Sequence, residues 1–211
     1  MKRYFVYGAG GHALVVMDAA ELCGFEITGF IDDFSHDPSR RIADKVVYPP
    51  AVLQAGDVVF MGFGDNKMRQ QIGRKLLECN VEVKTLIHPS AIVSRYAEIG
   101  TGCYIGAQAI VDPGCKIGDF VILNKNSVIS HNSVIGAATH VCPGTMCAGW
   151  CSVGERCFLG IGTKLIAQIT LADDIYVGGG TVIVENFCTP GVLLYGVPAR
   201  VRVPTAKKQV K

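Results

Sequence analysis

Two histidines, His131 and His140, stand in a long segment otherwise rich in glycine and apolar residues. An imidazole titrates near neutral pH, so it can take a proton from an attacking amine or hydroxyl. His131 comes two places after Ile129, at a position where neighbouring six-residue units carry Pro, Asp, Lys or Ala. We expect it to project outward and to act as the general base. A surface histidine without a role is the alternative.

A second motif with chemical potential opens the chain. Residues Gly8 to Ala13 read GAGGHA between a short apolar run and a segment with helical spacing, and Asp32 follows about twenty positions later. Glycines at a helix N-terminus let backbone N–H groups approach phosphate, and the acidic residue can accept a ribose hydroxyl. The pattern predicts a nucleotide site; a glycine turn that only packs helix on strand is the alternative.

The element that must position His131 is a repeat of six residues. Every sixth residue from Ile87 to Ile183 is apolar, and the residue four places later is often small. This period fits neither an α-helix nor a flat meander, so it predicts short strands joined by tight turns. If three units make one coil, residues 18 apart stack roughly 4.8 Å apart. Gly149 would then lie one coil from His131, where its N–H could stabilise an oxyanion; a plain corner glycine is the alternative.

The N-terminal segment alternates strands and helices. Apolar runs at residues 3–7, 27–31, 58–61 and 81–86 read as strands, and residues 14–23 and 67–79 read as helices. About 84 residues hold only one mononucleotide half of a Rossmann fold, so a nucleotide-linked substrate is favoured over NAD. We expect an α/β Rossmann-like domain at 1–84, an all-β parallel β-helix at 85–190 and a C-terminal tail at 191–211.

Composition excludes several classes of protein. The 211 residues carry a net charge of +2, with no basic cluster before the Lys207, Lys208 and Lys211 tail, so we expect no nucleic-acid partner. No apolar run reaches 18 residues and no secretory signal opens the chain, so we expect a soluble, cytoplasmic protein without a membrane partner. Nine scattered cysteines without CxxC spacing are expected to be mostly reduced.

Together these segments resemble the hexapeptide-repeat sugar acyltransferases with an N-terminal nucleotide-sugar domain. That family includes sialic acid O-acetyltransferases and UDP-N-acetylbacillosamine-type N-acetyltransferases. The motifs that carry the resemblance are GAGGHA, GFIDD, GDNKMR, IHPSA, ISHNSVIG, HVCPG, LADD, GGG and GVPAR, while CAG and CFLGI look most like the amino-sugar branch. The resemblance implies a left-handed β-helix, acetyl-CoA as co-substrate, and a homotrimer with active sites between subunits.

The resemblance also implies roles for individual residues. His131 matches the catalytic base, but Asn132 stands where the family commonly has Asp or Glu; an asparagine can still hold a histidine tautomer by hydrogen bonding. Asn124 matches a position near the substrate. The acetyl-CoA groove would be lined by His140, Ile161 and Gly179, and the nucleotide sugar would be contacted by Gly10, Gly11, His12, Asp32, Asp33 and Gly64. For all of these, ordinary packing or turn formation is the alternative.

The function expected from these observations is acetyl-CoA-dependent N-acetylation of a nucleotide-linked amino sugar. The amine would attack the thioester directly while His131 takes its proton. O-acetylation of a sialic-type sugar and a non-catalytic nucleotide-sugar scaffold remain open as alternatives. His131 and His140 have no third ligand at suitable spacing, so no metal is expected.

Overall fold

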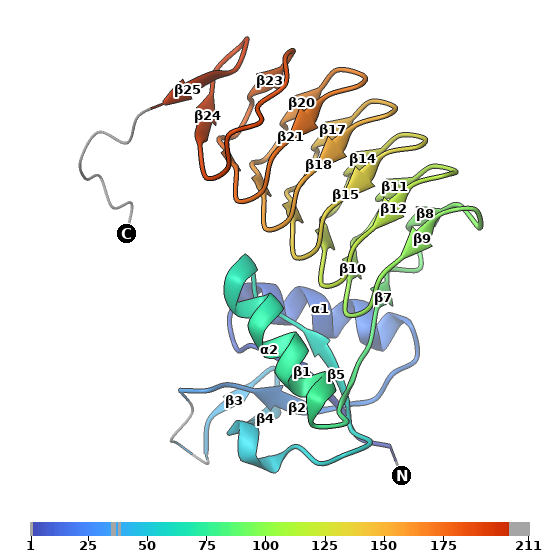
Figure 1. Cartoon of the computed structure of the whole chain (residues 1–211). Helices are drawn as coiled ribbons and strands as arrows, with labels where there is room; N and C mark the ends of the chain where they lie inside the picture. The colour runs from blue at the N-terminus through green and yellow to red at the C-terminus, as the bar shows by residue number, and fades with distance from the viewer. Residues whose placement is uncertain (1, 35–36, 38, 203–211) are drawn as a thin grey trace.

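The computed structural model describes residues 2–34, 37 and 39–202 and contains an α/β domain followed by a β-solenoid (Figure 1). The α/β domain has one six-stranded sheet in the order β3-β4-β2-β1-β5-β6, parallel except for the β3–β4 pair. Its elements are β1 (Tyr4–Tyr7), α1 (Gly11–Leu22), β2 (Ile27–Ile31), β3 (Arg41–Ile42), β4 (Lys45–Tyr48), η1 (Pro50–Val52), β5 (Val58–Met61), α2 (Asn66–Glu78) and β6 (Glu82–Val83). The strand order reverses at β1, which places a crevice at the carboxyl ends of β1, β2 and β5.

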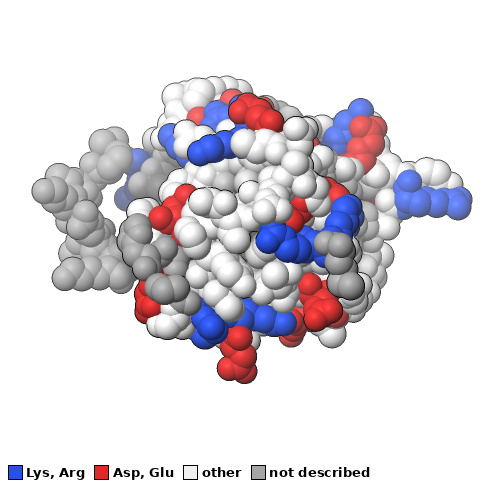
Figure 2. All heavy atoms as spheres, turned by 90° about the horizontal axis from the view of Figure 1, so that it is seen from below, with Lys and Arg blue, Asp and Glu red and all other residues white. Residues whose placement is uncertain are grey.

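The two helices cover opposite faces of this sheet. Val6 and Phe60 belong to the apolar cluster that contains α1, whereas Phe5 and Val59 pack in the cluster that contains Leu76 of α2. A parallel sheet buried on both faces needs strands that are apolar throughout, as β5 is. On the end of the molecule formed by this domain, acidic and basic side chains are interspersed around an uncharged surface (Figure 2).

The solenoid is built from two-residue strands in three parallel sheets, called here the first, second and third faces. The first face holds β7 (Leu86–Ile87), β10 (Tyr104–Ile105), β13 (Ile122–Leu123), β16 (His140–Val141), β19 (Phe158–Leu159) and β22 (Tyr176–Val177). The second holds β8 (Ile92–Val93), β11 (Ile110–Val111), β14 (Val128–Ile129), β17 (Met146–Cys147), β20 (Lys164–Leu165) and β23 (Val182–Ile183). The third holds β9 (Glu98–Ile99), β12 (Lys116–Ile117), β15 (Val134–Ile135), β18 (Ser152–Val153) and β21 (Thr170–Leu171).

The register confirms three six-residue units per coil. Ile105 pairs with Leu123, and each such step advances the chain by 18 residues. The expected α/β domain followed by a parallel β-helix is therefore confirmed. Turns join the faces at three corners: the first corner leads from the first face to the second, the second corner from the second to the third, and the third corner back to the first.

The small polar residues of the repeat form hydrogen bonds between successive coils. The Thr139 hydroxyl donates to the Gly154 carbonyl at 2.8 Å and accepts the Cys157 N–H at 2.9 Å. The Cys157 thiol repeats the pattern by donating to the Ala172 carbonyl at 3.1 Å. Four cysteines occupy such slots, and all nine in the chain are free. A small side chain with one donor satisfies backbone groups that would otherwise be buried without partners.

The α/β domain packs against the N-terminal coils of the solenoid. Helix α1 shares its apolar cluster with Tyr104 and Ile122 of the first face. Helix α2 lies on the third corner, where a Cβ at Gly73 would stand only 2.4 Å from the Phe120 ring. The two domains therefore share one continuous packed boundary.

The segment from residue 191, expected as a tail, contributes two strands to the first face. They are β24 (Leu193–Tyr195), which pairs with β22, and β25 (Arg200–Arg202). Leu194 joins the solenoid core, which explains why the chain continues the sheet there. The Lys207, Lys208 and Lys211 cluster lies outside the described residues. Within the part described, no helix is long and apolar enough to cross a membrane.

Candidate active site

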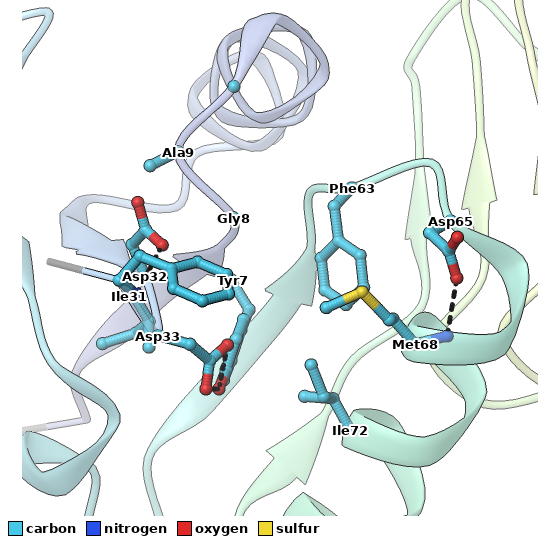
Figure 3. Close-up of a pocket in the computed structure, with 12 residues that line it drawn as sticks. Tyr7, Gly8, Ala9, Ile31, Asp32, Asp33, Phe63, Asp65, Met68 and Ile72 are labelled. Atoms are coloured by element: carbon cyan, nitrogen blue, oxygen red, sulfur yellow. Dashed lines mark hydrogen bonds between the residues drawn. The ribbon is translucent and has the colours of Figure 1, made fainter. Parts of the chain in front are cut away.

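A cavity of about 360 Å³ lies at the carboxyl ends of β1, β2 and β5, where the sheet order reverses (Figure 3). The predicted residues Gly10, Asp32 and Asp33 line it. The cavity is also lined by residues to which the sequence assigned no role in a site, namely Tyr7, Ile31, Phe34, Phe63, Asp65, Met68 and Ile72. Tyr7 is the last residue of β1, and this strand-end position is the signal that could have identified it.

The glycines of the GAGGHA motif have two different roles. Gly8 has φ +117°, and a Cβ there would meet the Gly62 carbonyl oxygen at 2.8 Å, so Gly8 is required by the turn. At Gly10 and Gly11 an added Cβ would meet nothing within 4 Å. Packing therefore does not require glycine at these two positions, and the backbone stays open to the crevice. Helix α1 begins there without a side-chain cap or an acidic first turn, which favours an anion.

The two aspartates of the pocket are held by different partners. Asp32 forms an ion pair with Arg40 at 2.6 Å. Asp33 accepts hydrogen bonds from the Tyr7 hydroxyl at 3.0 and 3.1 Å. Burial, reinforced by the hydrogen bond to Asp33, raises the pKa of Tyr7 well above its usual value. Tyr7 is thus a permanent donor, and it fixes the Asp33 carboxylate in the pocket wall.

His131 lies exposed at the second corner, with its ring against the next coil. A Cβ at Gly149 would stand 2.6 Å from Cε1 and 2.7 Å from Nε2 of His131, so only glycine admits the imidazole there. The Asn132 side-chain nitrogen lies 3.1 Å from Nδ1 of His131. Trp150 packs edge-on at 6.4 Å between ring centroids. The expected stacking of residues 18 apart thus places His131 and Gly149 together.

A second group of predicted residues meets at the domain boundary. The His12 and His140 rings lie 6.3 Å apart, and the Asn124 amide nitrogen is 3.4 Å from Nε2 of His140. A Cβ at Gly64 would stand 3.8 Å from the His140 ring. His140 is buried, whereas its predicted groove neighbour Ile161 is exposed. The structure therefore groups His140 with the predicted nucleotide-sugar residues His12 and Gly64.

Both boundary histidines are neutral at physiological pH. Burial, with the nearby Arg69 charge as a second cause, lowers the pKa of His140 to about 3 and that of His12 to about 4. Nε2 of His12 and Nδ1 of His140 are buried without a hydrogen-bond partner among the described residues. Two neutral imidazoles with unused nitrogens can bind a polar group brought by a ligand.

Ile161 and Gly179 stack on each other at the first corner. A Cβ at Gly179 would lie 3.0 Å from the Ile161 side chain. The first corner, with Asn124, Ile161 and Gly179, and the second corner, with His131 and Gly149, lie at opposite ends of the second face. One chain therefore does not bring the candidate base to the other predicted solenoid residues. Across the described ranges, no three His, Cys, Asp or Glu side chains gather as a metal site would need.

A nucleotide-type crevice joined to a β-solenoid that holds a histidine against a backbone glycine defines a hexapeptide-repeat acyltransferase. Residues 3–76 match the PglD N-terminal domain family. The structure of PerB from Caulobacter crescentus, in complex with CoA and GDP-perosamine, is 34% identical with a TM-score of 0.88, over 96% of this chain and 98% of that one. The chain belongs to the hexapeptide-repeat acetyltransferases that carry a PglD N-terminal domain.

Other relatives match over different shares of their length. The acetyltransferase domain of PglB from Neisseria gonorrhoeae, in complex with acetyl coenzyme A, is 30% identical with a TM-score of 0.89, over 95% of this chain and 99% of that one. UDP-3-O-acylglucosamine N-acyltransferase from Bordetella pertussis is 33% identical over 97 residues, which is 44% of this chain. The chain matches only 27% of that relative's length.

Proposed function

We propose that this protein is an acetyl-CoA-dependent N-acetyltransferase that acts on a nucleotide-linked amino sugar. The observation that carries the proposal is the His131 imidazole lying directly against the Gly149 backbone at an open corner of the solenoid. The uncrowded backbone of Gly10 and Gly11 at the start of α1 supports an acceptor sugar that is linked to a nucleoside diphosphate. The relatives solved with CoA, GDP-perosamine or acetyl coenzyme A support both substrate classes.

In the proposed reaction the amine nitrogen attacks the thioester carbonyl carbon and Nε2 of His131 takes the amine proton. The Gly149 N–H faces the developing oxyanion; such a donor contributes about 3 kcal/mol to the barrier reduction. The C–S bond then breaks, the thiolate takes the proton from His131, and the products are an amide and free CoA. No covalent enzyme intermediate and no metal take part.

The proposed base needs its proton on Nδ1 so that Nε2 is free. The Asn132 side-chain nitrogen lies 3.1 Å from Nδ1, an arrangement that donates to Nδ1 and favours the opposite tautomer. A flip of this amide turns its oxygen toward the ring, where it accepts the Nδ1 proton and frees Nε2. This chain therefore fixes the base less firmly than an acidic residue would.

We also propose a homotrimer, which the separation of the two corners supports. Apart from Lys164, the outward side chains of the second face between them are apolar: Ile92 is 65% exposed and Met146 is 48% exposed in the single chain. Three chains packed on these faces around a three-fold axis would bring the second corner of one chain to the first corner of its neighbour. His131 and Gly149 would then face the neighbour's Asn124, Ile161 and Gly179, with acetyl-CoA between the chains.

The test is CoA thiol release with acetyl-CoA and a panel of UDP- and GDP-linked amino sugars, with free sialic acid as the O-acetylation arm. His131→Ala should lower kcat by about 100-fold or more while the protein stays folded by circular dichroism. If only sialic acid gave turnover, the proposed N-acetylation would be wrong and the activity would be O-acetylation. An absence of turnover with every acceptor would overturn the proposed enzyme activity and favour a binding scaffold.

A further inference from the structure

Among the residues that the structure describes, Arg69 of α2 is the largest fully buried side chain, with an exposed fraction of 0%. Its guanidinium donates to oxygens of the solenoid and to oxygens of the α/β domain. Nε reaches the Phe120 carbonyl at 2.8 Å and Nη2 reaches the Ala138 carbonyl at 2.7 Å. Nη1 lies 3.1 Å from the Gly64 carbonyl and 3.3 Å from that of Phe63. Nη2 also donates to the Asn66 side-chain oxygen at 2.9 Å.

These acceptors belong to two different parts of the molecule. Phe120 and Ala138 form the third corner of two successive solenoid coils. Phe63, Gly64 and Asn66 lie in or next to the turn between β5 and α2. No ion pair joins Arg69 to a carboxylate in the described part of the chain. The guanidinium thus satisfies carbonyl groups from both domains at once, which no shorter or neutral side chain can do.

The turn that Arg69 holds also borders both candidate ligand regions. Phe63 and Asp65 line the nucleotide cavity, and Gly64 lies beside the His140 ring. Asn66 continues the connection by donating to the Arg156 and Cys157 carbonyls at 3.0 and 2.9 Å. Any shift of this turn would therefore move the nucleotide pocket relative to the solenoid.

We propose that Arg69 is a positioning residue that fixes the nucleotide pocket at a set distance from the solenoid, so that the acceptor amine reaches the thioester. This inference rests on the proposed function. Burying a charged side chain without a carboxylate partner is costly in free energy. We therefore infer that the site requires Arg69 for the geometry that its hydrogen bonds impose and not for a gain in stability. Burial lowers the pKa of Arg69 to about 10, so the guanidinium remains charged at neutral pH.

The experiment compares Arg69→Met and Arg69→Lys with Arg3→Met in the full chain. Arg3 also bridges segments, pairing with Asp57 at 2.6 Å and donating to the Val52 carbonyl, but at the opposite end of β1 from the cavity. Both Arg69 variants should lower kcat by about 100-fold, since small misplacements of reacting groups have effects of that size. The KM for acetyl-CoA should stay within about two-fold, because Ile161 and Gly179 lie at a different corner. Arg3→Met should lose only thermal stability.

Hydrogen exchange supplies a readout that does not depend on turnover. The Gly62 N–H, which donates to the Tyr7 carbonyl, and the Met68 N–H, which donates to the Asp65 side chain, should exchange at least about ten-fold faster in the Arg69 variants and at the wild-type rate in Arg3→Met. Unchanged exchange and unchanged kcat in a folded Arg69 variant would overturn the inference. So would unfolding of both Arg69 variants while Arg3→Met folds, because Arg69 would then be structural only. If the wild-type protein showed no turnover and the variants still showed this exchange pattern, the proposed function would be wrong. The role of Arg69 in fixing the turn against the solenoid would stand.

Discussion

At the residue scale, Asn132 controls the histidine on which the proposed chemistry depends. Its amide lies 3.1 Å from Nδ1 of His131. Replacing Asn132 with Asp offers only acceptor oxygens, so Nδ1 must carry the proton, and the carboxylate stabilises the imidazolium as it forms. We expect Asn132→Asp to raise kcat by about three- to ten-fold. Steady-state kinetics with the best acceptor checks this.

Asn132→Ala is the matched control, and we expect it to lower kcat because nothing then orients the ring. Asn132 has φ +57°, a conformation that asparagine tolerates better than alanine, so thermal unfolding of each variant must be measured alongside. A lower kcat in folded Asn132→Asp would contradict the tautomer argument.

The sequence predicted the second-corner residues better than those at the domain boundary, for a physical reason. Residues 18 apart in a repeat of this period must stack, so His131 and Gly149 could be placed together from numbers alone. His12 and His140 are separated by 128 positions and meet only because α1 packs on the first face. No periodicity links a helix of one domain with a strand of another, so their proximity and their lowered pKa values could not be derived beforehand.

At the element scale, the coils are held by the polar slots of the repeat as well as by their apolar core. Thr139 bridges a carbonyl and an N–H of the following coil. Thr139→Val keeps the shape but leaves both backbone groups buried without a partner, which should cost about 2–3 kcal/mol of unfolding free energy. Urea unfolding measures this.

Thr139→Ser is the control for that measurement. It retains the hydroxyl and loses one buried methyl group, so about 1 kcal/mol should be lost. Equal losses in the two variants would mean that packing and not hydrogen bonding fastens the coils. The sequence indicated that these slots hold small residues; it did not indicate that the polar ones bridge coils, because glycine or alanine would satisfy the same pattern.

At the scale of the whole molecule, the domain boundary makes stability depend on pH. Unfolded imidazoles titrate near pH 6.5, whereas burial lowers the pKa of His140 to about 3 and of His12 to about 4. The unfolded chain therefore binds more protons below pH 6.5, and stability falls as the pH drops from there toward 4. Each histidine should account for about 2 kcal/mol lost between pH 7 and pH 5.

Urea unfolding of wild type and His140→Asn at both pH values tests this. The variant should lose about 2 kcal/mol less than wild type on acidification, whatever its stability at pH 7. Carboxylates elsewhere act equally on both proteins, so they cancel in the comparison. An identical loss in the two proteins would show that His140 is protonated in the folded state at pH 5.

The proposed trimer gives a prediction that no single-chain site can reproduce. If each site takes His131 from one chain and Asn124 from its neighbour, then His131→Ala and Asn124→Ala chains are each inactive alone. Refolding them together in equal amounts creates a complete site wherever an Asn124→Ala chain supplies His131 to a His131→Ala neighbour. Random assembly around a three-fold axis makes this one arrangement in four, so roughly a quarter of wild-type activity should return.

Met146→Glu tests the same assembly from the opposite direction. A carboxylate on the exposed second face would be buried between chains, so it should dissociate the trimer and abolish activity, while Leu22→Glu, on an exposed position of α1, should do neither. Light scattering should give about three times the 22.5 kDa chain mass for wild type and one chain mass for Met146→Glu. If the mixed chains stayed inactive although both had assembled as trimers, His131 and Asn124 would not share a site, and the argument from opposite corners would fail.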